Sequence, residues 1–247
     1  MLKSFDRDTE ITILHRDEQI VAIYKPAGMV VHPTDLARDE KISLMLLVRR
    51  MLRQRVWPVH RLDRPTSGII LFALDRETAS ELGKLLQARE VQKRYLAVVR
   101  GIPADQEIDY ALKERPLYRT DLVTSEPQKA TTTLRRLSQV EIPVAVGRYA
   151  TSRYALVELT PTTGRRHQLR RHMKHIFHPI IGDTTYGDGV HNRYFRDAFD
   201  CDRLLLTATG LSFNHPVSGE RLTVIAEPDQ DFRNVLGRLG MMLPPHD

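Results

Sequence analysis

The segment His60-Arg61-Leu62-Asp63-Arg64-Pro65-Thr66-Ser67-Gly68 stands directly before the apolar run Ile69-Ile70-Leu71-Phe72-Ala73-Leu74. A short apolar run after turn residues is typical of a buried strand, here expected over residues 68–74. The proline, the glycine and the two hydroxyl side chains of the segment favour a loop of fixed shape. We therefore expect Asp63 on a loop anchored by rigid sheet, a common place for functional groups. From residue types alone, an aspartate that only caps a turn fits equally well.

The surrounding pattern predicts more strands than helices. Strands are expected at residues 12–15, 19–25, 93–100, 131–142, 153–160, 204–211 and 222–226, and helices at 40–55, 76–89, 166–176 and 231–239. Residues 113–129 are polar and are expected to form a loop. The order is no regular strand–helix alternation, which favours an α+β fold with a largely antiparallel sheet. Because the sequence contains no internal repeat and no linker-like segment, we expect an arm at residues 1–11 and a single domain over 12–247.

Composition narrows the class of protein. The chain has 247 residues, 41% of them hydrophobic and 28% charged, and a formal charge of +6 with a pI of about 9.5. A basic protein attracts polyanions, of which nucleic acid is the commonest. No apolar run approaches the roughly 20 residues of a membrane span, and the N-terminus has no apolar signal core. The single cysteine, Cys201, fits a reducing cytoplasm and excludes cysteine-rich zinc sites.

Basic residues gather in two segments. One contains Arg165, Arg166, Arg170, Arg171 and Lys174, with His167, His172 and His175 between them. The other contains Arg49, Arg50, Arg53 and Arg55. Such clusters are typical of phosphate-contacting surface, although a solvated helix face has the same pattern. The histidines match no zinc signature, so we expect no metal site.

The segment at residues 60–68 resembles the signature His-Arg-Leu-Asp-x-x-Thr-Ser-Gly of the pseudouridine synthase family that acts on large ribosomal and transfer RNA. Further family motifs follow in order at residues 24–28, 93–95, 163–170 and 178–187, and the likeness spans residues 12–228. The resemblance implies the pseudouridine synthase fold, with a bent mixed sheet, flanking helices and an active-site cleft. It also implies an RNA-modifying isomerase that needs no redox cofactor, because the reaction neither oxidises nor reduces.

The resemblance assigns roles to individual residues. It implies that Asp63 is the nucleophile, that Arg170 pairs with it, and that Tyr95 stacks on the uracil near the position of the departing C5 proton. Arg61 corresponds to the arginine that fills the gap left by an extruded base. The remaining RNA-binding residues implied are His60, Arg165, Arg166 and Arg171.

Three further stretches, at residues 39–41, 142–149 and 170–172, resemble a branch of the family that modifies uridine-65 in the T stem of tRNA. The alternatives are a sister enzyme acting on large-subunit ribosomal RNA and, in another class, a non-catalytic RNA-binding protein. Because the Lys-Pro-Ala-Gly turn is reached by residue 25, we expect no N-terminal S4 RNA-binding domain of the kind that several relatives carry, and no obligate protein partner is implied. Relatives often carry Leu-His-Ala where this chain has Leu206-Thr207-Ala208. This departure bears on the identity of the substrate more than on the ability to catalyse the reaction.

Overall fold

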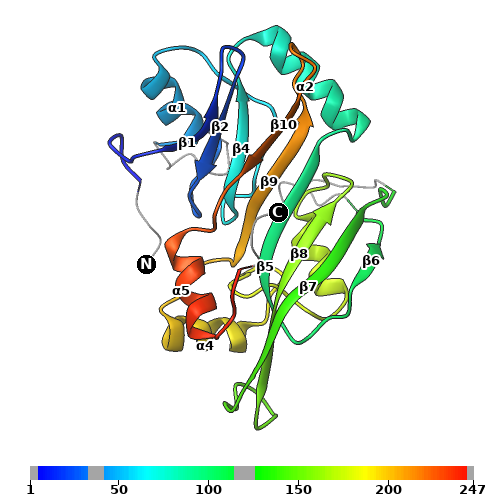
Figure 1. Cartoon of the computed structure of the whole chain (residues 1–247). Helices are drawn as coiled ribbons and strands as arrows, with labels where there is room; N and C mark the ends of the chain where they lie inside the picture. The colour runs from blue at the N-terminus through cyan, green and yellow to red at the C-terminus, as the bar shows by residue number, and fades with distance from the viewer. Residues whose placement is uncertain (1–4, 33–41, 114–125, 244–247) are drawn as a thin grey trace.

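The computed structural model describes residues 5–32, 42–113 and 126–243 (Figure 1). Its helices are α1 (Leu44–Leu52), α2 (Arg76–Ala88), α3 (Gln168–His175), α4 (Gly189–Phe199) and α5 (Gln230–Arg238). Its strands are β1 (Thr12–Arg16), β2 (Ile20–Lys25), β3 (Trp57–Pro58), β4 (Ser67–Ala73), β5 (Gln92–Arg100), β6 (Gln106–Asp109), β7 (Thr131–Ile142), β8 (Ser152–Pro161), β9 (Leu206–Asn214) and β10 (Arg221–Ile225).

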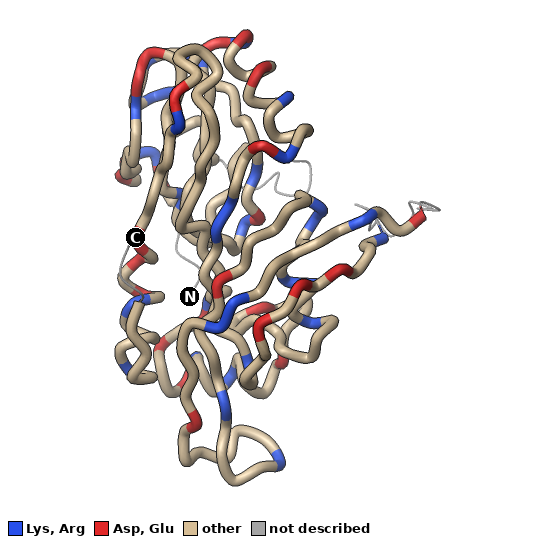
Figure 2. Tube along the Cα trace, turned by 45° about the vertical axis from the view of Figure 1, so that its right-hand side comes forward, with Lys and Arg blue, Asp and Glu red and all other residues tan. Residues whose placement is uncertain are grey.

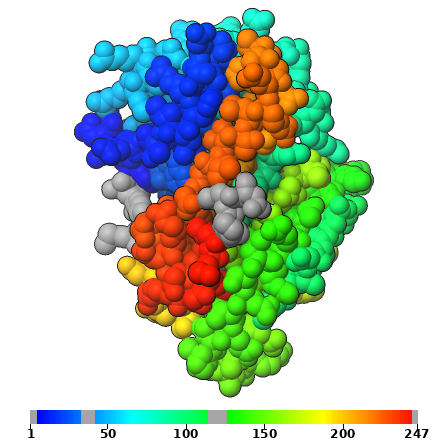
Figure 3. Space-filling model, viewed as in Figure 1, coloured from blue at the N-terminus to red at the C-terminus, as the bar shows by residue number. Residues whose placement is uncertain are grey.

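These strands form one mixed sheet in the order β1-β2-β4-β9-β5-β8-β7-β6, with β10 paired to β9 and β3 to β4. All pairings are antiparallel except the short parallel contact of β4 with β9, which consists of Ser67 opposite Thr207 and Gly68 opposite Ala208. Figure 3 shows β9 and β10, in orange, between the N-terminal strands and the β7–β8 region. The predicted α+β class with a largely antiparallel sheet is confirmed.

The strand alternation buries both faces of the sheet. In β4, Ile70 and Phe72 pack with the α1 side chains, whereas Ile69 and Leu71 lie on the face that Leu82 of α2 covers. In β8, the alternate side chains divide in the same way between α3 on one face and α4 with α5 on the other. The helices therefore cover both faces of the sheet (Figure 1).

Tyr95 of β5 lies where two of these packing clusters meet. It contacts the cluster under α1 and also the cluster under α3. The centre of the sheet, at β4, β9 and β5, is therefore where residues from the two halves of the chain can form a common site.

Three elements were not predicted: the two-residue strand β3, and α4 and β6, both of which have weak hydrophobic patterns. In α4 only Phe195 is buried, and the helix start is fixed by the Asp188 carboxylate, which accepts from the backbone of Val190. In β6 only Ile108 is buried, and the strand is held at the sheet edge by β7. A local cap at α4 and backbone pairing with β7 at β6, more than apolar periodicity, determine these two elements.

Other boundaries differ by a few residues. The helix predicted from residue 40 is described from Leu44, and residues 40–41 lie outside the described part. Most of the loop predicted at 113–129 also lies outside it. The Asp75 cap of α2 is confirmed, since its carboxylate accepts from the backbone N of Thr78 at 2.7 Å. In the arm, Phe5 and Ile11 pack against the α1 cluster. No helix in the described ranges has the length and apolar character of a bilayer span.

Candidate active site

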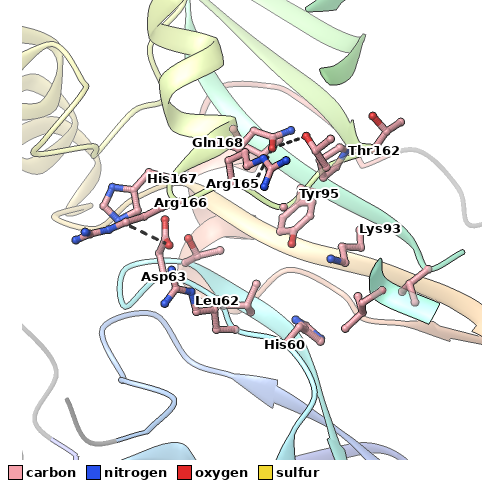
Figure 4. A pocket seen from close by; sticks show the side chains of 18 of the residues that line it. His60, Leu62, Asp63, Lys93, Tyr95, Thr162, Arg165, Arg166, His167 and Gln168 are labelled. Atoms are coloured by element: carbon pink, nitrogen blue, oxygen red, sulfur yellow. Dashed lines mark hydrogen bonds and ion pairs between the residues drawn. The ribbon is translucent and has the colours of Figure 1, made fainter. Parts of the chain in front are cut away.

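A cavity of about 560 Å³ opens at the centre of the sheet (Figure 4). Its walls come from the signature loop, from β5, from the end of α2 and from the segment that leads into α3. The lining includes His60, Arg61, Leu62, Asp63, Thr66, Lys93, Tyr95, Thr163, Arg165, Arg166, His167, Gln168, Arg170 and Leu206. Its volume is in the range of pockets that bind small organic groups, and a nucleobase is such a group.

The turn at residues 25–28 supports the signature loop. Lys25 is fully buried, and its Nζ donates to the carbonyl oxygens of Pro26, Met29 and Arg64 at 2.9, 2.8 and 3.1 Å. The backbone N of Gly28 donates to the same Arg64 carbonyl at 2.9 Å. These bonds fix the backbone immediately after Asp63, so two motifs distant in sequence hold one loop.

The end of the signature meets β9 through close backbone packing. Gly68 has φ of +108°, and a Cβ there would stand 2.1 Å from the Ala208 carbonyl oxygen. Only glycine satisfies both constraints. The Ser67 hydroxyl accepts from Nη2 of Arg203 at 2.8 Å, and Arg203 also pairs with Asp229 at the start of α5. The C-terminal part of the chain therefore anchors the strand that follows Asp63.

The Asp63 carboxylate has a different neighbour at each oxygen. Nη1 of Arg170 lies 3.3 Å from Oδ2, and Nε2 of His167 lies 3.8 Å from Oδ1. The Asp63 side chain is 24% exposed, whereas that of Arg170 is only 5% exposed. The carboxylate thus faces the cavity while its guanidinium partner stays behind it.

Arg170 is held in place by a second carboxylate. Its Nε and Nη2 bond both oxygens of Asp183 at 2.7 and 2.8 Å. Burial would raise the pKa of Asp183, but the bonds and charge of Arg170 outweigh this and lower it. Such bidentate pairing fixes the guanidinium plane. Arg170 therefore presents its remaining nitrogen to Asp63 from a fixed position.

His167 occupies a strained position beside Asp63. Its φ is 55°, in the left-handed region that non-glycine residues seldom adopt, and its Nδ1 lies 3.0 Å from the Tyr186 hydroxyl. Burial is the main cause that lowers the His167 pKa, which favours the neutral ring. His167 and Asp183 were not predicted as site residues, although both lie in family motifs, at residues 163–170 and 178–187. Backbone strain of this kind is frequent at functional sites.

Gln168 shapes the loop before α3. Its side-chain oxygen accepts from the Thr163 hydroxyl at 2.7 Å and from the backbone N of Arg165 at 3.0 Å. Its amide group donates to the Thr131 carbonyl and the Thr132 hydroxyl, both at 3.0 Å. Because Gln168 is buried and fully bonded, the loop and the side chains it carries have one defined position.

Tyr95 lies across the cavity from the signature loop, as Figure 4 shows. Burial raises the pKa of its hydroxyl, and the nearby Asp63 charge adds to the effect. The hydroxyl is therefore neutral at physiological pH, and the ring presents a flat surface to whatever enters.

The arginines predicted to bind RNA separate into two groups. Arg61, Arg165 and Arg166 line the cavity; Arg61 and Arg165 are exposed and Arg166 is half-buried. Arg171 is absent from the lining, and its Nη1 donates to the Lys113 carbonyl at 2.9 Å. Three of the four predicted arginines thus surround the opening, and the fourth lies on another face of α3.

His60 lines the cavity, yet its ring is bonded to the sheet. Its Nε2 accepts from the backbone N of Leu71 at 3.2 Å. Burial lowers the His60 pKa to about 3, and the neighbouring Lys93 charge contributes to this. An uncharged ring bonded to β4 holds the loop in place, and we see no phosphate-binding cation in it.

Thr207, at the family's histidine position, is fully buried in β9 and stands opposite Ser67. It does not line the cavity, whereas its neighbour Leu206 does. The departure from the family pattern therefore lies behind the wall of the site.

The remaining histidines near α3 have partners within the protein. His172 contacts the Thr132 hydroxyl and the Tyr110 carbonyl, and His178 contacts the Arg100 carbonyl. Within the described ranges no three histidine, cysteine, aspartate or glutamate residues gather in a way that could hold a metal ion.

Comparison with known proteins gives concordant results. The family model described as RNA pseudouridylate synthase matches residues 19–175. A protein of Pectobacterium carotovorum named tRNA pseudouridine synthase C is 50% identical over 94% of this chain, and the chain spans 63% of its length. A protein of the same name from Vibrio cholerae is 46% identical, with 93% of this chain and 96% of that protein covered.

A solved structure is also similar. The human RNA pseudouridylate synthase domain containing 4 matches with a TM-score of 0.70 and 27% identity, over 94% of each chain. The fold and the sequence motifs therefore point to the same group of proteins.

Proposed function

The chain belongs to the RNA pseudouridylate synthase family, and we propose that it converts a uridine of tRNA to pseudouridine with Asp63 as the nucleophile. It is thus an RNA pseudouridine synthase, an isomerase. The choice of tRNA is supported by the names of the relatives, and uridine-65 of the T stem is the proposed target because of the motifs at 142–149 and 170–172. A cytoplasmic location, and a single catalytic domain over residues 12–247 preceded by an arm, belong to the same proposal.

The reaction breaks the N1–C1′ bond of uridine, turns the uracil and joins C5 to C1′. The C5 proton is lost and N1 takes up a proton, so nothing is oxidised or reduced and no redox cofactor is required. A carboxylate in the cavity can divide this change into two easier steps. Whether Asp63 bonds the sugar or the base, its oxygen must be ionised and must face the substrate.

The surroundings of Asp63 suit this role. Nη1 of Arg170 lies 3.3 Å from Oδ2, while Oδ1 lies 3.8 Å from Nε2 of His167, whose pKa is lowered mainly by burial. In our proposal Oδ1 is the reacting oxygen, and the opposite wall, formed by the Tyr95 ring, stacks against the uracil.

A uridine in folded RNA must leave its stack to reach this cavity. Extrusion costs a few kcal/mol, and a planar cation that fills the gap offsets part of the cost. Arg61 is exposed at the cavity and two residues from Asp63, so we propose that it takes the place of the base. Arg165 and Arg166 then contact the phosphates at the opening.

The observation that carries the proposal is the 3.3 Å contact of Arg170 with Asp63 in a cavity large enough to admit a nucleobase. The test compares Asp63→Asn with wild type on a tRNA transcript, by chromatography of the digested nucleosides. We expect product formation to fall by about 10⁴-fold or more, as when a catalytic nucleophile is removed, with little change in tRNA binding.

Asp197→Asn serves as the matched control, since Asp197 is exposed on α4 outside the cavity. It should retain wild-type turnover. Normal turnover by Asp63→Asn would end the proposal, and product found only in ribosomal RNA would redirect its substrate.

A further inference from the structure

Lys93 lines the same cavity as Tyr95 and has no part in the reaction described above. The two residues are two positions apart on β5, so their side chains project from the same face of the strand. Figure 4 shows the Lys93 side chain next to Tyr95 and above His60. The cavity therefore holds a cation on the wall where the uracil ring is proposed to stack.

The Lys93 ammonium has no carboxylate or other hydrogen-bond acceptor within residues 5–32, 42–113 and 126–243. Its neighbour His60 offers no acceptor, because Nε2 of that ring already accepts from Leu71 and the other nitrogen of a neutral ring carries the proton. Burial lowers the pKa of Lys93. A half-buried cation without a protein partner is costly, which indicates that its acceptor is a ligand.

The chemistry of the cavity supplies such an acceptor. When the N1–C1′ bond breaks, its electron pair stays on the uracil, and the negative charge spreads from N1 to the O2 and O4 oxygens. Arg170 is bonded to Asp183 and Asp63, so it is already engaged. Lys93, by contrast, lies beside Tyr95 on β5 and faces the same cavity.

We infer that the Lys93 ammonium donates to a carbonyl oxygen of the detached uracil and stabilises its negative charge while the base turns, an inference that rests on the proposed function. Lys93 keeps its proton throughout. The electron pair returns in forming the C5–C1′ bond, and the C5 proton departs as N1 gains one, so charge and protons balance. A donor fixed in a site with little water acts most strongly on charge that develops in the transition state.

A backbone phosphate is the competing acceptor for any lysine in an RNA-binding protein. Arg61 and Arg165 are exposed where they line the cavity, so phosphates can reach them, whereas Lys93 is half-buried. The two acceptors differ in what they change. A uracil contact acts on the chemical step, and a phosphate contact acts on affinity and on its salt dependence.

The test measures the single-turnover rate at saturating enzyme and, separately, tRNA affinity over a range of salt concentrations. Lys93→Met removes the charge at similar length, Lys93→Gln keeps a polar group, and Lys93→Arg keeps the charge. Lys84→Met is the control, because Lys84 is exposed on α2 and pairs with Glu81. We expect Lys93→Met and Lys93→Gln to slow the chemical step about 10²–10³-fold while tRNA affinity stays almost unchanged, as for loss of one electrostatic donor. Lys93→Arg, which keeps the charge, should retain part of the rate.

Weaker binding with a salt slope reduced by about one and an unchanged single-turnover rate would assign Lys93 to a phosphate and overturn the inference. Wild-type behaviour of Lys93→Met and Lys93→Gln would also overturn it. Retained tRNA affinity shows that a slow variant is folded. If the wild-type protein forms no pseudouridine in this assay, the proposed function itself fails, which is a separate result.

Discussion

The arginines at 165–171 and those at 49–55 are alike in sequence and differ in the structure. The side chains of Arg165 and Arg166 line the cavity, and Arg170 forms its buried ion pair. In the second segment, Arg49 donates to the Val56 carbonyl, and Arg50 donates to the Arg7 carbonyl and pairs with Asp8. None of the arginines at 49–55 is among the residues that line the cavity.

The difference shows what charge clustering leaves undecided. Figure 2 shows Lys and Arg positions interspersed with Asp and Glu along the described part of the chain, so they mark no single face in this view. One segment carries a motif that fixes its loop through Gln168 and buries an arginine against Asp183. The other lies at the end of α1 and contributes no residue to the cavity lining. The surroundings of a guanidinium, more than its sign, decide what it does.

The strongest test of this comparison is Arg170→Met. We expect pseudouridine formation to fall at least about 10²-fold, the loss typical of a removed electrostatic partner. We also expect the free energy of unfolding to fall by about 3–5 kcal/mol, because Asp183 is left buried and uncompensated. Turnover and thermal unfolding measure the two effects.

A double variant, Arg170→Met with Asp183→Leu, separates them. Replacing both members of a buried pair by apolar groups often restores stability. In the double variant the free energy of unfolding should return toward the wild-type value, whereas pseudouridine formation should stay low. If pseudouridine formation also returns, the guanidinium is not needed beside Asp63.

A smaller effect is expected for Arg61→Ala. Losing the cation that fills the gap should slow the single-turnover rate about 10-fold, since it offsets only part of a flipping cost of a few kcal/mol. Affinity for tRNA should change less than the rate. An unchanged single-turnover rate would remove Arg61 from base extrusion.

The smallest effects compare the two segments directly. Arg166→Ala should reduce tRNA affinity and lower the slope of log affinity against log salt by about one, as expected when one phosphate contact is lost. Arg50→Ala should leave both unchanged, because its guanidinium already pairs with Asp8 and bonds the Arg7 carbonyl. If Arg166→Ala and Arg50→Ala changed the salt slope equally, the bound RNA would have to extend over α1.

The sequence predicted the elements whose pattern is local. The apolar run at 69–74 and the Asp75 cap are visible without a structure, because strand burial and capping act over a few residues. The helix α4 was missed because its one buried side chain, Phe195, packs against the distant Tyr154, and the strained backbone of His167 was missed because its partner Tyr186 lies 19 residues away. Asp183 was missed for the same reason, and its role is visible only once α3 places Arg170 against it.

The most direct measurement is a crystal structure of Asp63→Asn bound to a tRNA T-stem RNA. We predict that the target uracil lies outside its helix, between residue 63 and the Tyr95 ring, with Arg61 in the space it left. A uracil still stacked in the RNA, with the cavity beside Arg170 unfilled, would contradict the account.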